Sequence, residues 1–163
     1  MNTRPTPNIS FREDVAALTD LTLTVFKLHG ALLQWGDKLV DPLGLTSARW
    51  QVLGAIALAG VPLTAPQVGG AMGVTRQGAQ KQLNLLLKLG LVEAGDNPAH
   101  QRSPLYALTA RGRQLYDQAE ERWASRAAAL AREVLTADVL AANVTLDTML
   151  RHLNSSTNSP GVS

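Results

Sequence analysis

Apolar residues recur along most of this chain at the three- and four-residue steps of amphipathic helices. From about Phe11 to Leu39 they occupy more than one side of the predicted helix, so this helix needs more partners than a small domain usually supplies. The sequence DPLG at 41–44 interrupts it. Thr46 can cap the next helix, which ends at Gly60. The pattern therefore predicts a first helix with a subunit interface along it.

A short helix, a turn that contains glycine and a longer helix with a polar side come next. After a connector at 61–63, Thr64 begins the short helix, which runs to about Met72. Gly73 lies in the turn, and Thr75 begins the longer helix, over about 75–89. This order is typical of a helix-turn-helix whose second helix reads DNA, although ordinary helical bundles contain it too.

The polar residues of the longer helix gather on one side. On a helical wheel they cover an arc of about 140°, and they are Arg76, Gln77, Gln80, Lys81, Asn84 and Lys88. Three cations, three amides and no acid suit phosphates and base edges, while the alternative is a solvated side of an amphipathic helix. Leu87 lies among the polar residues on the wheel, and Gln82 lies among the apolar ones. The wheel does not explain why positions 85 and 87 are leucines.

Two short strands are predicted after this helix, at 91–94 and 104–108, with turn-forming residues at 95–103 between them. A hairpin directly after a reading helix makes a winged helix. Beyond Thr109, an alanine-rich helix is predicted from Ala110 to about Leu135, and Thr136 begins a last helix. The fold class is therefore mainly α, an α+β winged helix of about six helices with a two-stranded β-hairpin.

Charge is concentrated in one part of the chain. The 163 residues are 45% hydrophobic, enough for one domain with a core, and carry a net charge of +2. Between Arg76 and Arg113 there are six cations and two acids, a net of +4, so the remainder sums to −2. Such a local excess is expected where a protein contacts a polyanion.

The residues needed for most other kinds of site are absent or scattered. There is no cysteine, and His29, His100 and His152 have no metal-ligand spacing. No nucleophile motif or phosphate-binding glycine loop occurs. We therefore predict no catalytic residue, no metal site and no cofactor. No apolar run reaches the length of a membrane span and the N-terminus has no signal pattern, so we expect a cytoplasmic protein without membrane contact.

Three stretches together resemble the multiple-antibiotic-resistance regulator (MarR) family of bacterial transcription factors. They are LTSARWQVLGAIALAG, LTAPQVGGAMGVTRQGAQKQLNLLLKLGLVE and NPAHQRSPLYALTARG. The resemblance covers about Leu21 to Leu135, and its most specific part is the wing that ends in Leu-Thr-x-x-Gly. It implies an intertwined homodimer that binds a pseudo-palindromic double-stranded DNA operator. It also implies a repressor that a small aromatic or phenolic effector releases from DNA.

The resemblance also implies how the chain is divided. We expect a flexible arm at 1–10, a dimerisation helix at 11–45 and a DNA-binding lobe at 46–112. Two further dimerisation helices are expected at 110–153, and a flexible tail at 154–163. Within the lobe, the recognition helix is at about 75–89 and the wing at about 91–108.

By the same resemblance, two groups of residues contact DNA. The recognition helix contributes Thr75, Arg76, Gln77, Gln80 and Lys81, and the wing contributes His100, Gln101 and Arg102. The two cations of the helix suit guanine or phosphate, and the two glutamines suit adenine or backbone. Arg102 corresponds to the arginine that enters the minor groove. His100 stands where the family usually has an acid, and a neutral histidine cannot form an ion pair with that arginine.

An effector pocket is implied on the segments that line it in the family, at His29, Trp35, Arg49, Trp50 and Tyr116. Trp50 also fits plain core packing, and His29 could bond to a backbone carbonyl instead. Two other functions stay open. One is a winged helix used for dimerisation or protein contact without DNA binding, against which the local basic charge counts. The other is a ligand-binding dimer whose lobes no longer fit DNA.

Overall fold

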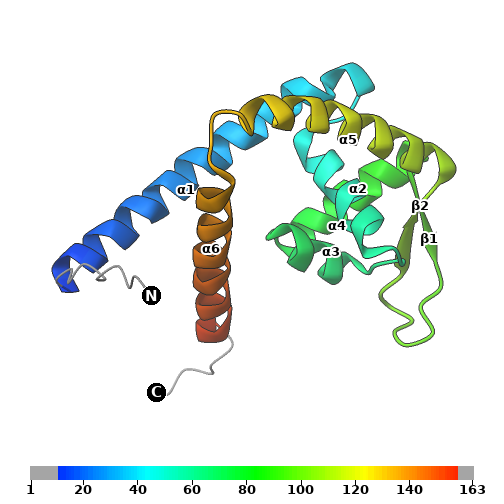
Figure 1. Ribbon diagram of the computed structural model, residues 1–163. Helices are drawn as coiled ribbons and strands as arrows, with labels where there is room; N and C mark the ends of the chain where they lie inside the picture. The colour runs from blue at the N-terminus through cyan, green and yellow to red at the C-terminus, as the bar shows by residue number, and fades with distance from the viewer. Residues whose placement is uncertain (1–10, 158–163) are drawn as a thin grey trace, which may run out of the picture. The chain divides into compact units, whose positions relative to one another are not determined.

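The computed structural model describes residues 11–157, which form helices and one small sheet (Figure 1). The elements in chain order are α1 (Phe11–Val40), a 3₁₀ turn η1 (Asp41–Leu43), α2 (Ser47–Ala59), α3 (Ala65–Met72), α4 (Arg76–Lys88), β1 (Val92–Gly95), β2 (Leu105–Leu108), α5 (Ala110–Leu130) and α6 (Thr136–Thr157). Six α-helices and a two-stranded hairpin confirm the predicted fold class. The chain forms two compact units, Met1–Ala119 and Glu120–Ser163, and α5 belongs to both.

The core of the first unit is aliphatic. Its largest fully buried side chains are Val40, Val52, Leu53, Val68, Leu83 and Leu86. They come from α1, α2, α3 and α4, and Tyr106 of β2 and Tyr116 of α5 join the same cluster. Burial of each such aliphatic side chain contributes about 2 kcal/mol. In Figure 1, α2, α3 and α4 gather next to the hairpin, so this core supports both α4 and the wing.

Threonine side chains cap the three helices that were predicted to begin after them. The Arg49 backbone N–H donates to Thr46 Oγ1 at 3.4 Å, and the Gly78 N–H donates to Thr75 Oγ1 at 3.0 Å. Thr64 and Gln67 form a reciprocal capping box at the start of α3. Each cap satisfies an amide that has no partner inside its helix, at about 1 kcal/mol.

The turn between α3 and α4 depends on two glycines. Gly73 has φ of +63°, a left-handed conformation that other residues rarely adopt. At Gly69, a Cβ atom would lie 3.0 Å from the carbonyl oxygen of Val74, which is backbone and cannot easily move. The Val74 N–H donates to the Gly69 carbonyl at 3.0 Å. The two helices therefore approach closely enough to form the predicted helix-turn-helix.

The hairpin has a third strand-like neighbour that the sequence did not predict. β1 and β2 pair antiparallel, with Ala94 opposite Tyr106. Leu63, which we predicted to lie in a simple connector, forms a bridge with Tyr106 from the other side. The Tyr106 N–H donates to the Leu63 carbonyl at 2.8 Å, and the Leu63 N–H donates back at 3.0 Å. Tyr106 is thus held by backbone neighbours on both edges.

The end of α4 is joined to the start of α5. Gly90 has φ of +67°, and the Gly90 and Leu91 amides donate to the Leu87 and Leu86 carbonyls, both at 3.0 Å, as in a Schellman cap. Thr109 Oγ1 donates to the Gly90 carbonyl at 2.8 Å, and the Thr109 N–H donates to the Leu91 carbonyl at 3.2 Å. This junction explains the Leu-Thr-x-x-Gly signature. Its glycine, Gly112, packs so closely on Leu91 that a Cβ atom would overlap the Leu91 carbonyl oxygen.

The C-terminal helices differ from the prediction at two ends. α5 was expected to reach about Leu135 but ends at Leu130. There the backbone changes to i→i−3 bonds, from Arg132 to Ala129 and from Glu133 to Leu130, which close the helix in a tight turn. α6 continues to Thr157, four residues into the segment that we expected to be a flexible tail. The arm predicted at 1–10 and the rest of that tail lie outside the described residues.

We expected no apolar run as long as a membrane span, and this expectation is wrong. The helical segment Phe11–Leu43 is long and apolar enough to cross a membrane, judged by its length and composition only. However, Asp20, Lys27, Gln34 and Asp41 recur every seven residues and form a polar stripe along it. Such a stripe is typical of a helix with one side in water and the others packed on protein, and charges inside a membrane span are costly. The length and composition of Phe11–Leu43 are therefore weak evidence for a membrane segment.

Candidate nucleic-acid interface

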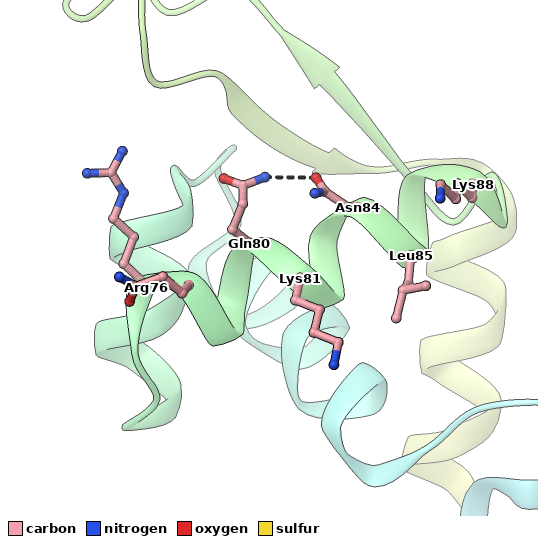
Figure 2. Close-up of a pocket in the computed structure, with 7 residues that line it drawn as sticks. Arg76, Gln80, Lys81, Asn84, Leu85 and Lys88 are labelled. Atoms are coloured by element: carbon pink, nitrogen blue, oxygen red, sulfur yellow. Dashed lines mark hydrogen bonds between the residues drawn. The ribbon is translucent and has the colours of Figure 1, made fainter.

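The side of α4 that was predicted to read DNA faces outward. Arg76, Gln77, Lys81, Asn84 and Lys88 are exposed, and Gln80 is partly exposed. Together with Leu85 they line one open hollow along the helix, shown in Figure 2. Thr75 is also exposed, and its hydroxyl caps the helix. No acid lines the hollow, and its three cations are spread along the helix length.

One side chain on this surface has a fixed orientation. Gln80 Nε2 donates to the Tyr106 hydroxyl at 2.8 Å and to Asn84 Oδ1 at 2.9 Å. The second bond is the dashed line in Figure 2, where Gln80 and Asn84 lie along the same edge of α4. Tyr106 is only 3% exposed. The sequence did not predict a role for Tyr106 at this site, because Tyr106 fits the pattern of an ordinary strand residue.

The two leucines that the wheel left unexplained have different positions. Leu87 packs against the hydrophobic core of the first unit, so it belongs to the buried side despite its place on the wheel. Leu85 is half-buried and lines the outward hollow next to Lys81 and Lys88. An apolar side chain there suits the methyl group of thymine or the aliphatic part of a neighbouring lysine.

The wing tip is organised by Asn97. Its Nδ2 donates to the Ser103 carbonyl at 2.7 Å across the loop, and its Oδ1 accepts from the Ala99 N–H at 3.1 Å. The backbone completes two turns, with His100 N–H donating to the Asn97 carbonyl and Ser103 N–H donating to the His100 carbonyl. His100, Gln101 and Arg102 are exposed at this tip. The loop is thus held by an amide side chain, in a wing that lacks the usual acid at His100.

Replacing Asn97 by alanine should loosen the wing tip without unfolding the lobe. Both side-chain bonds would be lost, and each contributes about 1 kcal/mol. We expect faster amide hydrogen exchange at Ala99 and Ser103, with core amides unchanged. Asn97→Asp is the matched variant, because it keeps the acceptor for Ala99 but loses the donor to Ser103. Equal exchange in all three proteins would show that Asn97 does not organise the loop.

The five residues assigned to an effector pocket lie on α1, α2 and α5. His29 is exposed in the chain by itself, so burial does not require a partner for its ring. Trp35 is 37% exposed. Trp50 packs against the core and Tyr116 belongs to it. Arg49 is half-buried at the start of α2. Core packing thus describes Trp50 and Tyr116 in this chain, and the pocket stays a prediction.

Comparisons with known proteins agree with this arrangement. A family model described as MarR family matches residues 43–103, which contain the helix-turn-helix and the first half of the hairpin. An uncharacterized protein of Mycobacterium tuberculosis is 41% identical over 102 residues, which are 63% of this chain and 70% of that protein.

Three solved structures share the fold at lower identity. A MarR family transcription regulator has a TM-score of 0.72 at 21% identity, covering 90% of this chain and 97% of that one. An Escherichia coli MarR mutant complexed with operator DNA has a TM-score of 0.67 at 21% identity, with coverage of 84% and 95%. CouR from Rhodococcus jostii, bound to p-coumaroyl-CoA, has a TM-score of 0.64 at 22% identity, with coverage of 88% and 96%.

Proposed function

Because this chain belongs to the MarR family of winged-helix transcription regulators, we propose that it represses transcription as a homodimer bound to double-stranded DNA. α4 enters the major groove of each half-site, and the β1–β2 hairpin reaches the adjacent minor groove. The operator is pseudo-palindromic, as the two-fold symmetry of the dimer requires, and its half-sites lie about one helical turn apart, so that both recognition helices meet the major groove on the same face of the DNA. The protein acts in the cytoplasm, where its DNA is.

The observation that carries this proposal is the outward side of α4. Arg76, Lys81 and Lys88 lie there with amide side chains between them and no acid among the lining residues. A solvated helix side usually mixes both signs of charge, whereas this one combines donors for phosphate with groups that suit base edges. The E. coli MarR mutant complexed with operator DNA shows that a protein of this fold binds DNA.

Dimerisation is supported by exposed apolar side chains on α1 and on α6. On α1, Phe26 is 69% exposed, and Leu18 and Leu28 are about half exposed in the single chain. On α6, Leu140 is 60% and Val144 is 67% exposed. Soluble monomers rarely leave so many large apolar side chains in water. A second copy that packs on these helices would cover them.

Placing a charge on the apolar side of α1 should separate the protomers. Phe26→Asp would bury an unpaired carboxylate in the dimer, at a cost of several kcal/mol. Sedimentation velocity should show a monomer at micromolar concentration, and DNA affinity should fall with it. Gln34→Asp is the control, because Gln34 shares the polar stripe with Asp20 and Lys27. A Phe26→Asp protein that sediments like the wild type would refute this interface.

A small aromatic or phenolic ligand is proposed to release the DNA. The support is that CouR, which shares the fold, binds p-coumaroyl-CoA. The candidate contacts are His29, Trp35, Arg49, Trp50 and Tyr116. A ligand that enters beside Trp50 or Tyr116 must displace core contacts in this chain. His29 and Trp35 are therefore the first positions to test.

A gel shift with the DNA upstream of the protein's own gene tests the proposal directly. We expect a sharp shift at ~0.15 M salt that weakens steeply as salt rises, since phosphate contacts release counterions. Repeating the shift with a panel of aromatic acids would identify the effector by the loss of the shifted band. A dimer that shifts neither this DNA nor a random pool would instead support a module for protein contact.

A further inference from the structure

A carboxylate of α1 caps the first residue of α2, and this contact joins the helix proposed to form the dimer to the lobe proposed to bind DNA. We propose that Asp37 is a positioning residue, whose bond to the Ser47 amide sets the angle between α1 and α2 and thereby the spacing of the two α4 helices in the dimer. The inference rests on the proposed function, because it concerns how that dimer presents its two recognition helices.

The hydrogen bond between Asp37 and Ser47 connects two helices across ten positions of sequence. The Ser47 N–H donates to Asp37 Oδ1 at 2.6 Å. Ser47 is the first residue of α2, so its amide has no acceptor within that helix. A backbone N–H can only donate and a carboxylate can only accept, so the direction of this bond is fixed. A negative charge at the N-terminal end of a helix is also favoured by the helix dipole, and charge-assisted bonds are the strong ones.

The start of α2 has a second cap, which does not involve α1. The Arg49 N–H donates to Thr46 Oγ1 at 3.4 Å, and Thr46 directly precedes the helix. α2 can therefore begin without Asp37. Loss of the Asp37 carboxylate should change the direction of α2 relative to α1, whereas loss of the Thr46 hydroxyl should weaken only the helix end.

Close packing beside Asp37 restricts the same junction. At Gly36, a Cβ atom would lie 2.6 Å from Ser47 Oγ and 3.3 Å from Ser47 Cβ, so a side chain there would push the two helices apart. Ser47 is 4% exposed, and Val40, one turn further along α1, is fully buried. The contact at Gly36 resists closer approach of α1 and α2, and the bond to Asp37 resists their separation. Together the two contacts hold one angle.

This angle is transmitted to α4 through the core. Buried side chains of α2 and α4 share one cluster, and they are Val52, Leu53, Leu83 and Leu86. The two helices therefore move together. Because α2 has 13 residues and is about 20 Å long, a change of about 10° at its N-terminal end moves its other end by about 3 Å. This movement is close to the rise of one base pair, enough to change which half-site spacing the dimer fits.

Distances between spin labels on the two α4 helices test the inference in the absence of DNA. The chain has no cysteine, so Gln77→Cys places one label at an exposed position of α4 in each protomer. In this full-length protein, double electron–electron resonance should give one narrow distance distribution. Adding Asp37→Ala should widen the distribution or shift its mean by about 3 Å or more, the movement that about 10° at the junction produces. Asp37→Asn keeps the Oδ1 acceptor and should retain the original distribution.

Thr46→Ala is the matched control, because it removes the other cap of α2 and leaves Asp37 in place. It should lower the midpoint of thermal unfolding, as Asp37→Ala does, but keep the original distance distribution. Gly36→Ala is the second variant in case Asp37→Ala does not fold, because its added Cβ presses on Ser47 and should also shift the distance.

The inference is overturned if neither Asp37→Ala nor Gly36→Ala changes the distance distribution, or if Thr46→Ala changes it as much as Asp37→Ala does. In either case the dimer and its binding to DNA would still stand. A labelled protein with no dipolar signal would instead be a monomer, which overturns the proposed homodimer together with this inference.

Discussion

Removing Arg76 and Arg102 together should lower operator affinity at least about 100-fold at ~0.15 M salt, with the fold unchanged. Arg76 lies on the outward side of α4, and Arg102 is exposed at the wing tip. An arginine that contacts a base edge or a narrow minor groove contributes about 1–3 kcal/mol, and each protomer would lose two of them. Fluorescence anisotropy with labelled operator DNA measures the change directly. The slope of log affinity against log salt should also become shallower.

The control is a variant with the same loss of charge elsewhere. Arg126→Ala with Arg132→Ala also removes two exposed cations, which lie outside the basic part of the chain. Because both positions lie in the segment expected to form the dimer, sedimentation velocity must show that this variant is as dimeric as the wild type. If affinity followed net charge alone, both double variants would bind equally. We expect the control to stay within about threefold of the wild type, since distant exposed charges are screened by salt. Wild-type affinity in the Arg76/Arg102 variant would rule out this surface as the DNA contact.

Replacing Gly112 by alanine should destabilise the lobe by about 3 kcal/mol or more. The added methyl would overlap the Leu91 carbonyl oxygen, which is backbone fixed by a hydrogen bond from Thr109. α5 could relieve the clash only by moving away from the end of α4. Urea denaturation should show a lower midpoint, or the variant should fail to fold.

A loss of stability in Gly112→Ala would distinguish the clash from the effect of helix propensity, which has the opposite sign. Gly112 lies in the first turn of α5, where alanine is intrinsically better than glycine by up to about 1 kcal/mol. Gly70→Ala in α3 is the matched control, because a Cβ atom there meets nothing within 4 Å. We expect that variant to be as stable as the wild type or more so. A stable Gly112→Ala protein would mean that the junction can open without cost.

Local chemistry made the helices predictable. The threonines at 46, 64 and 75 occupy the caps that their side chains suit, and Gly73 and Gly90 adopt the left-handed conformation that ends a helix. Such signals depend only on a few neighbouring residues, so one sequence suffices. The end of α5 had no such signal. An alanine-rich run contains no glycine or proline to mark the turn at 131–134.

The features that were missed depend on contacts between distant segments. Leu87 is partly buried because it packs against the core, and a helical wheel of α4 alone cannot show that contact. Tyr106 orients Gln80 across 26 positions of sequence, and Asn97 was one of many turn formers until the structure showed its bond to Ser103. The residue types on the outward side of α4 could be predicted, but the hydrogen bonds that orient them could not.

The junction between α4 and α5 fixes the C-terminal end of α4, so a change of angle there moves the N-terminal end of the helix most. Three successive carbonyls, at Leu89, Gly90 and Leu91, accept hydrogen bonds from Arg111 and Thr109 at the start of α5. Because α4 has 13 residues, its N-terminal end lies about 20 Å from this junction. A tilt of about 10° at the junction would move Arg76 by about 3 Å, close to the rise of one base pair. If α4 binds DNA as proposed, a small change in the direction of α5 is therefore enough to take the N-terminal end of α4 out of register with the operator.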